Sequence, residues 1–216
     1  MIIYSGPNDD KREISIELPQ HHRRIGVMLS GGADSAVLLY LLALERKQTN
    51  SEHELITLTV PRSDGATYYV DAIVDKVNEL IPDANIPKPI RLGDPTVHHS
   101  QQGKSGEIEA RQRYGIEHVF YGSQSHPPVP MPGEYPNRPT QREFLNNRGV
   151  ISTTCPFALV DKRHTIDLYE IFQVWPLIEL THSCTHQTAG RCGVCYNCVE
   201  RAWACESLGY RDPGLA

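Results

Sequence analysis

The sequence has no hydrophobic run long enough to cross a membrane. Its longest apolar run is Ala36–Leu44, about half of what a transmembrane helix needs. The first residues, Met1 to Tyr4, lead directly into Gly, Pro and Asp without the apolar stretch of a secretory signal. We therefore expect no membrane partner and a cytoplasmic location.

The sequence also lacks a basic stretch. Its formal net charge is −5, and basic residues adjoin one another only as isolated pairs, namely Lys11-Arg12, Arg23-Arg24, Arg46-Lys47 and Lys162-Arg163. Proteins that grip a long nucleic acid usually carry a basic balance or a basic stripe. We therefore expect no nucleic-acid partner.

What is present is the composition of an ordinary soluble globular protein. The chain has 216 residues, of which 39% are hydrophobic and 22% are charged, which suits one large domain or one domain with an appendage. Six cysteines in a reducing compartment do not indicate a disulfide framework.

Strand and helix patterns alternate along the chain. An edge strand is expected at 13–18, and further strands and helices follow in turn at 25–30, 34–46, 55–60, 68–81, 88–92, 106–114 and 117–122. This alternation predicts an α/β fold with a doubly wound, mostly parallel sheet. Ligands of such sheets bind at the carboxyl ends of the strands. We expect Thr59-Val60-Pro61 and Tyr121-Gly122-Ser123 to lie at two such ends.

Another such end carries the glycine turn Ser30–Ser35, which stands between a strand pattern and a helix pattern. Gly31 and Gly32 have no side chain, so the turn's N–H groups can converge on an anion. The helix that follows adds its partial positive charge, and the hydroxyls of Ser30 and Ser35 add donors. The pattern predicts a phosphate site, although a capped helix start explains the same residues without a ligand. The Asp34 carboxylate suits a helix start, but it would repel phosphates unless Mg²⁺ lay between them.

A proline-rich stretch covers residues 126–149. A stretch of this length inside a compact domain is either a linker or a functional loop. Because it follows a strand end that faces the expected crevice, we interpret it as a substrate loop.

Four cysteines follow the spacing C-x7-C-x2-C-x2-C, at Cys184, Cys192, Cys195 and Cys198. Four thiolates at this spacing are typical of a closed, structural Zn²⁺ site. An iron–sulfur cluster, a disulfide pair and free core cysteines are the alternatives. His182 or His186 could replace one cysteine as a ligand.

The two remaining cysteines, Cys155 and Cys205, fall outside this pattern. We interpret both as buried small hydrophobes.

The turn residues Ser30, Gly31, Gly32, Ala33, Asp34 and Ser35 resemble the SGGxDS loop of the N-type ATP pyrophosphatase (PP-loop) superfamily. The resemblance implies that the protein binds ATP and cleaves it between the α- and β-phosphates. It also implies that the backbone at Thr59 and Val60 contacts adenine.

The chain as a whole resembles the 7-cyano-7-deazaguanine synthase family. The similar stretches are Ser30–Ser35, Tyr135-Pro136-Asn137 with Arg138-Pro139 and Glu143-Phe144, Pro156–Lys162, and Leu180–Cys198 with its seven-residue gap. The resemblance implies an ATP pyrophosphatase domain over residues 1–150, with its substrate loop at 126–149. Residues 151–216 are then expected to complete the domain and to carry the zinc site.

The family resemblance also implies a reaction. An ATP-dependent ligase would convert 7-carboxy-7-deazaguanine and ammonia to the nitrile, with Ser30, Asp34, Ser35 and Lys162 acting on ATP. ATP, Mg²⁺ and a structural Zn²⁺ are the implied cofactors, and a homodimer is the implied assembly. A solvated lysine at a helix start is the alternative for Lys162.

The sequence departs from the family near the expected substrate pocket. It has Lys162-Arg163-His164 where the family often has Lys-x-Glu, and His182-Ser183-Cys184 where the family has Trp-Ser-Cys. A relative that stops at the amide or takes another deazapurine acid therefore stays open. A tRNA thiolase with a cysteine-bound cluster and a non-enzymatic nucleotide-binding module are the more distant alternatives.

Overall fold

A six-stranded, mostly parallel sheet forms the centre of the computed structural model, which describes residues 1–94, 96–97, 99–133 and 135–213. The strands are β3 (Arg24–Met28), β4 (Glu54–Thr59), β5 (Ile90–Arg91), β6 (His118–Tyr121), β7 (Glu143–Leu145) and β8 (Ile151–Thr154). Their spatial order is β5-β4-β3-β6-β8-β7, and only β7 runs antiparallel to its neighbour among these strands. The α/β fold class expected from the sequence is confirmed.

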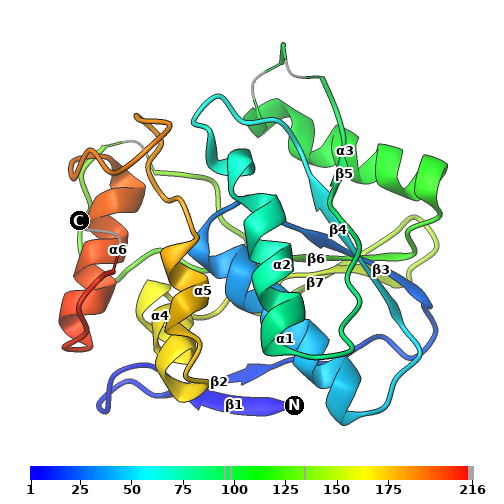
Figure 1. The fold of residues 1–216 in the computed structure, drawn as a ribbon, viewed down its shortest axis with the longest axis horizontal. Coiled ribbons are helices and arrows are strands. Elements are labelled where there is room, and N and C mark those ends of the chain that lie inside the picture. Colours follow the sequence, from blue (N-terminus) through cyan, green and yellow to red (C-terminus); the bar gives the residue numbers. More distant parts are fainter. Residues whose placement is uncertain (95, 98, 134, 214–216) are drawn as a thin grey trace.

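Helices cover both faces of the sheet (Figure 1). They are α1 (Ala33–Gln48), the 3₁₀ turn η1 (Ala66–Tyr68), α2 (Val70–Leu80), α3 (His99–Tyr114), α4 (Lys162–Ile171), α5 (Trp175–Glu179) and α6 (Tyr196–Ser207). The larger core joins α1, α2, α4, α5 and α6 to one face, and α3 packs on the other. No helix within the described part of the chain has the length and hydropathy needed to span a membrane.

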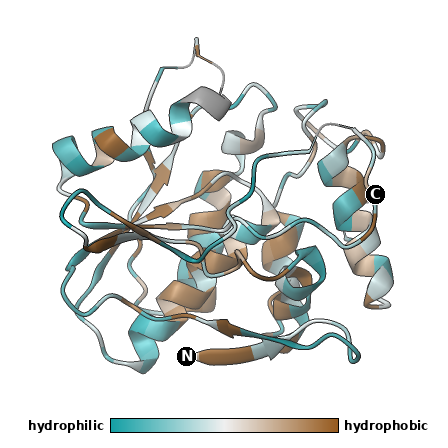
Figure 2. Ribbon diagram, turned by 180° about the vertical axis from the view of Figure 1, so that it is seen from behind, coloured by the Kyte–Doolittle hydropathy of each residue, from teal (hydrophilic) through white to brown (hydrophobic). Residues whose placement is uncertain are grey.

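Side chains of β3 and β4 alternate between the two cores, as the two-residue period of a strand requires. Ile25 and Val27 belong to the larger core, while Met28, Ile56 and Leu58 belong to the smaller one. In Figure 2 the hydrophobic residues accordingly concentrate on the strands and the helices that cover them.

Helix α1 runs through the larger core, and every residue from 36 to 43 is buried. The apolar pattern on all sides of this segment predicts that burial, because such a helix cannot leave a face in water without cost. The helix therefore fixes the glycine turn that precedes it.

The stretch expected as an edge strand forms β2 (Arg12–Ser15), which pairs with β1 (Ile2–Ser5) in a separate two-stranded sheet. Ile14 and Ile16 are fully buried in the larger core. Burial of these two side chains, not pairing with the central sheet, holds this segment in place.

Several elements differ from the sequence-based expectations or add to them. Helix α3 begins at His99 instead of 106. Strand β1 and strand β7 were not expected, and β7 lies inside the proline-rich stretch with all three of its residues exposed. Strand β8, which pairs with β6, brings the chain beyond residue 150 into the same sheet.

A buried histidine at the start of β6 makes the stability of this fold depend on pH. His118 is 1% exposed; burial, aided by the positive charges of His22 and Arg111, lowers its pKa from the usual value of 6.5 to about 4. As pH falls from about 6.5 to about 4 the unfolded chain takes up a proton that the folded chain does not, which removes about 3 kcal/mol of stability.

We expect His118→Gln to flatten the pH dependence of the free energy of unfolding over this range. Urea unfolding at a series of pH values measures it, with the exposed His21→Gln as control. An unchanged slope between pH 6.5 and 4 in His118→Gln would contradict the assignment.

Candidate functional site

A cavity of about 330 Å³ opens at the carboxyl ends of β3, β4 and β6. It lies where the chain reverses its direction across the sheet, since β4 and β5 lie on one side of β3 and β6 on the other. This is where open α/β sheets bind their ligands. The residues that line it include Ser30, Gly32, Ala33, Asp34, Ser35, Val60, Arg62, Ser123, Gln124, Asn137, Arg138, Lys162, Ser183, Asn197 and Glu200.

The backbone of Gly31 shapes the glycine turn. Its φ is +86°, and a Cβ at this position would lie 1.9 Å from the carbonyl oxygen of Ala66. On the other side the His182 N–H donates to the Gly31 carbonyl at 2.9 Å. Only glycine fits between these two segments, so the turn is fixed before any ligand binds.

The two serine hydroxyls organise the same turn from inside. The Ser35 Oγ accepts from the Ser30 N–H at 3.2 Å and donates to the Gly32 carbonyl at 3.1 Å. The Ser30 Oγ accepts from the Gly32 N–H at 3.3 Å. The turn then passes directly into α1, whose first N–H groups carry the partial positive charge of a helix start.

The end of β6 packs tightly against the start of α1. A Cβ on Gly122 would lie 2.7 Å from the Ser35 nitrogen and 2.8 Å from the Asp34 carbonyl oxygen. A glycine at this strand end therefore lets the glycine turn approach the neighbouring strand, and Ser123 and Gln124 continue along the cavity wall.

A buried lysine reaches the turn from helix α4. Lys162 is 5% exposed, and its Nζ lies 2.5 Å from the Asp34 Oδ2. The other carboxylate oxygen of Asp34 accepts from Thr165 Oγ1 at 2.8 Å. The amide of Gln124, with its nitrogen turned toward Asp34, donates to Asp34 at 3.0 Å and accepts from Lys162 at 3.3 Å. Lys162 is therefore not a solvated lysine at a helix start.

The start of α4 is fixed by a capping box, which sets the position of Lys162. The Asp161 carboxylate accepts from the backbone of Arg163 and contacts the His164 ring. Burial acts to raise the pKa of Asp161, but hydrogen bonds from His164 and Arg163 outweigh it and hold this pKa well below its usual range. The cap stays ionised and keeps the helix start in place.

The far wall of the cavity is an ion pair between the proline-rich stretch and helix α6. Arg138 binds both carboxylate oxygens of Glu200, at 2.6 and 2.7 Å, and both side chains are nearly fully buried. The Arg138 guanidinium also lies 5.3 Å from the centre of the Tyr196 ring, and its Nη1 donates to the Ser125 carbonyl. Residues 136–138 thereby form part of the cavity wall.

Of the two residues expected to contact adenine, Val60 lines the cavity. Thr59 does not. Its side chain is buried, and its carbonyl accepts from the Leu92 N–H in the sheet. Thr59 is thus engaged in strand pairing, and Val60 alone of this pair faces the crevice.

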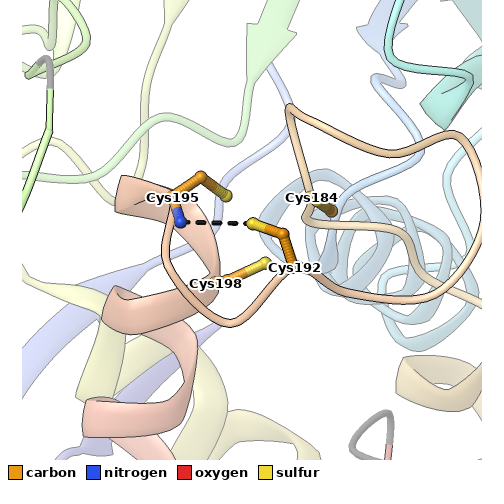
Figure 3. A group of neighbouring side chains, drawn as sticks. All are labelled: Cys184, Cys192, Cys195 and Cys198. Carbon is orange, nitrogen blue, oxygen red and sulfur yellow. Dashed lines mark hydrogen bonds between the residues drawn. The ribbon is translucent and has the colours of Figure 1, made fainter.

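The four cysteines of the C-terminal motif come together (Figure 3). Their sulfur atoms all lie within 4.8 Å of one another, and three of the four residues are buried. Backbone N–H groups point at these sulfurs: His186 donates to Cys184 at 3.4 Å, and Cys195 donates to Cys192 at 3.2 Å. Such bonds stabilise thiolates, which are the form that binds metal.

Two of these thiols have shifted pKa values. Burial acts to raise the pKa of Cys195, but hydrogen bonds from Thr185 and Cys198 outweigh it and lower this pKa to about 6. Burial raises the pKa of Cys198 to about 12, and the neighbouring Cys195 adds to the effect. A cation among the sulfurs would stabilise their thiolate forms, because cysteine binds a metal as the thiolate.

Neither histidine considered as a substitute ligand joins the four sulfurs. The His182 ring stacks on Tyr69 with 5.2 Å between ring centres, and its Nε2 lies 2.8 Å from the Gln187 carbonyl oxygen. His186 Nδ1 is 3.8 Å from the Cys192 sulfur, outside the four-cysteine group.

Cys155 and Cys205 are free and buried, at 4% and 1% exposure. Burial raises the pKa of both thiols, to about 12 for Cys155 and about 11 for Cys205. Their interpretation as small core residues is confirmed.

Sequence reasoning missed several residues of this site. Gln124 and Arg62 each follow a strand end by three positions, so the strand-end rule could have indicated both. Glu200 carries no such signal, because a charged residue on a short helix is usually solvated. The folded chain buries it in the cavity wall.

No family model and no curated protein matches the sequence. One solved structure with a similar chain trace is the U34-tRNA thiolase NcsA from Methanococcus maripaludis with its 4Fe–4S cluster, at a TM-score of 0.46 and 17% identity. The alignment covers 72% of this chain and 59% of that one. A likeness of this extent bears on neither the function nor the cofactor.

Proposed function

We propose that the protein is an ATP-dependent carbon–nitrogen ligase of the PP-loop type. It would act on 7-carboxy-7-deazaguanine and ammonia to give the nitrile through an adenylated intermediate. The observation that carries this proposal is a rigid glycine turn at the sheet's reversal point with the buried ammonium of Lys162 beside it. The choice of a deazaguanine acid rests on the family resemblance of the sequence.

The chemistry requires two activations. A carboxylate is a poor electrophile because its leaving group would be oxide. Transfer of AMP from ATP to the carboxylate releases pyrophosphate and turns that oxygen into part of AMP, a far better leaving group. Ammonia then displaces AMP to form the amide. A second adenylation, on the amide oxygen, lets AMP and a proton leave to give the nitrile.

The residues of the site have roles that follow from their positions. The turn Ser30–Ser35 would hold the β- and γ-phosphates by its N–H groups and align them with the leaving direction. Lys162 would neutralise charge that develops on the departing pyrophosphate. Gln124 and Thr165 hold Asp34 against Lys162, so the Asp34 charge is compensated beside the phosphates. Mg²⁺ would enter bound to the ATP phosphates as part of the substrate.

The cysteine site fits one tetrahedral ion. Thiolates around a single Zn²⁺ lie about 4 Å apart, given a Zn–S distance of about 2.3 Å, and the four sulfurs here lie within 4.8 Å of one another. A cubane cluster binds each cysteine through a different iron atom, which requires wider spacing of the sulfurs. We therefore favour Zn²⁺, which would hold the C-terminal segment in place and leave no position open for catalysis.

The same spacing favours this proposal over a tRNA thiolase that carries a cluster. The net charge of −5 also disfavours tRNA. A relative that stops at the amide remains the second candidate, because the cavity residue His182 stands where the sequence departs from the family.

The experiment that tests the proposal is incubation of the zinc-loaded protein with MgATP, ammonia and 7-carboxy-7-deazaguanine. We expect AMP and pyrophosphate, and a product whose mass is that of the nitrile. A product mass that stops at the amide supports the second candidate. Absence of AMP with this acid and with related deazapurine acids would overturn the ligase assignment.

A substitution at Gly32, which lines the cavity, tests nucleotide binding without disturbing the fold. A Cβ there would meet Ser30 Oγ at 3.4 Å and the His182 carbonyl oxygen at 3.7 Å, which are ordinary contacts. We expect Gly32→Val to keep the wild-type melting temperature and to weaken ATP binding at least about a hundredfold, because the branched side chain occupies the phosphate position. Calorimetric titration measures the affinity. Undiminished affinity would count against the turn as the phosphate site.

A further inference from the structure

Helix α6 carries a fully buried arginine that neither the cavity nor the cysteine site uses directly. Arg201 is 0% exposed. Its Nε and Nη2 donate to the Asp212 Oδ1 at 3.2 and 3.0 Å, and Arg191 binds the other oxygen of the same carboxylate. Burying an arginine is costly unless every donor is satisfied, and such a group usually fixes a geometry more than it adds stability.

The remaining donors of Arg201 reach the segment that supports the phosphate turn. Its Nη1 donates to the hydroxyls of Thr181 at 2.8 Å and Ser183 at 3.2 Å. These residues stand on either side of His182, whose N–H donates to the Gly31 carbonyl at 2.9 Å. Arg201 therefore binds the residues on both sides of His182, whose N–H holds the glycine turn in place.

The same short segment continues into the cysteine site. Cys184 follows Ser183, and Cys198 lies one helical turn before Arg201 on α6. The loop between the cysteines also touches the other support of the turn, because a Cβ on Gly65 would lie 2.9 Å from the Thr188 side chain, next to Ala66. A metal ion that joins Cys184 to Cys198 would thus fix the spacing between α6 and the segment that Arg201 holds.

We propose that Arg201 is a positioning residue that links the cysteine site to the phosphate turn, so that metal binding and nucleotide binding strengthen each other. The proposal rests on the assignment of the turn as the ATP site. A metal ion bound by the four sulfurs would fix the position of α6 relative to residues 181–184. Arg201 would in turn fix the position of His182 through Thr181 and Ser183. The His182 N–H then holds the Gly31 carbonyl in place. By thermodynamic linkage, the metal must raise ATP affinity by the same factor by which ATP raises metal affinity.

The test measures the dissociation constant of α,β-methylene-ATP with Mg²⁺, for zinc-loaded protein and for protein stripped by a chelator. We expect zinc removal to weaken binding about tenfold in the wild type, and less than about twofold in Arg201→Met. Zinc-loaded Arg201→Met should bind the analogue about tenfold more weakly than the wild type while it retains one zinc per chain. Arg201→Lys should fall between them, because one ammonium cannot reach both Thr181 and Asp212 as the forked guanidinium does.

Two further variants separate positioning from a general loss of stability. Arg211→Met removes the same charge from an exposed residue next to Asp212 and should leave the affinity unchanged. Thr181→Val removes one acceptor of Arg201 without removing its pair with Asp212, so it keeps the test available if Arg201→Met does not fold. It should weaken analogue binding about threefold.

The outcomes are distinct. The positioning role would be overturned if zinc-loaded Arg201→Met bound the analogue as tightly as the wild type. Thr181→Val serves for the same comparison if Arg201→Met does not fold. The positioning role would also be overturned if zinc removal weakened analogue binding by the same factor in the wild type and in the variant. A wild-type protein that binds no analogue would overturn the ATP site itself, and the linkage with it.

Discussion

Lys162→Met is expected to lower the rate of AMP formation about a thousandfold. The variant removes the ammonium that lies 2.5 Å from Asp34 and leaves a carboxylate facing the phosphates without its counter-charge. An unpaired charge at a buried site repels the developing negative charge of the departing pyrophosphate. Single-turnover release of AMP measures the effect, with the exposed Lys88→Met as the matched control.

A second substitution separates the two contributions of this pair. In Asp34→Asn/Lys162→Met the repelling carboxylate is gone, so we expect a rate above that of Lys162→Met alone and still well below that of the wild type. With Asp34→Asn alone and the wild type as the other two corners, the double-mutant cycle gives the interaction energy of the pair. AMP release by Lys162→Met within about threefold of the wild-type rate would remove Lys162 from the reaction.

Cys195→Ala is expected to lose the metal and to destabilise the C-terminal segment. Structural zinc contributes roughly 10–16 kcal/mol of apparent binding energy, and Cys195 both supplies a sulfur and directly precedes helix α6 as its N-cap residue. Loss of about 5 kcal/mol of that energy would lower the melting temperature by roughly 10–20 °C for a chain of this size. Metal analysis and calorimetry measure both effects.

Cys155→Ala is the matched control, because Cys155 is also a free buried cysteine but lies outside the four-sulfur group. It should retain one metal per chain and lose only about 1 kcal/mol, since removing one sulfur atom leaves a small cavity. A metal-free Cys195→Ala that melts at the wild-type temperature would show that the site has no structural role.

The parts of this molecule that follow from local pattern could be predicted from the sequence. The conformation of the turn Ser30–Ser35 follows from two adjacent glycines between a buried strand and an apolar helix. The four cysteines are close in sequence, so their meeting depends mainly on one loop. The parallel sheet follows from the alternation of strands and helices, because such connections leave few arrangements open.

The parts that depend on distant contacts could not be predicted. Lys162 comes to Asp34 from 128 positions along the chain, and Arg138 comes to Glu200 from 62 positions. Strand β7 lies in a proline-rich stretch, and its three exposed residues show no alternation. Arg201 is a charged residue at the centre of a buried network, where local propensity favours solvent. Tertiary packing decides each of these, and no local signal reports it.

The most direct test of the central claim is a crystal structure of the zinc-loaded protein with Mg²⁺ and α,β-methylene-ATP. We expect the β- and γ-phosphates within hydrogen-bond distance of the N–H groups of residues 31–35, with the Lys162 ammonium turned toward them and the adenine beside Val60. A triphosphate bound away from the glycine turn, with that turn in contact with solvent alone, would contradict the account.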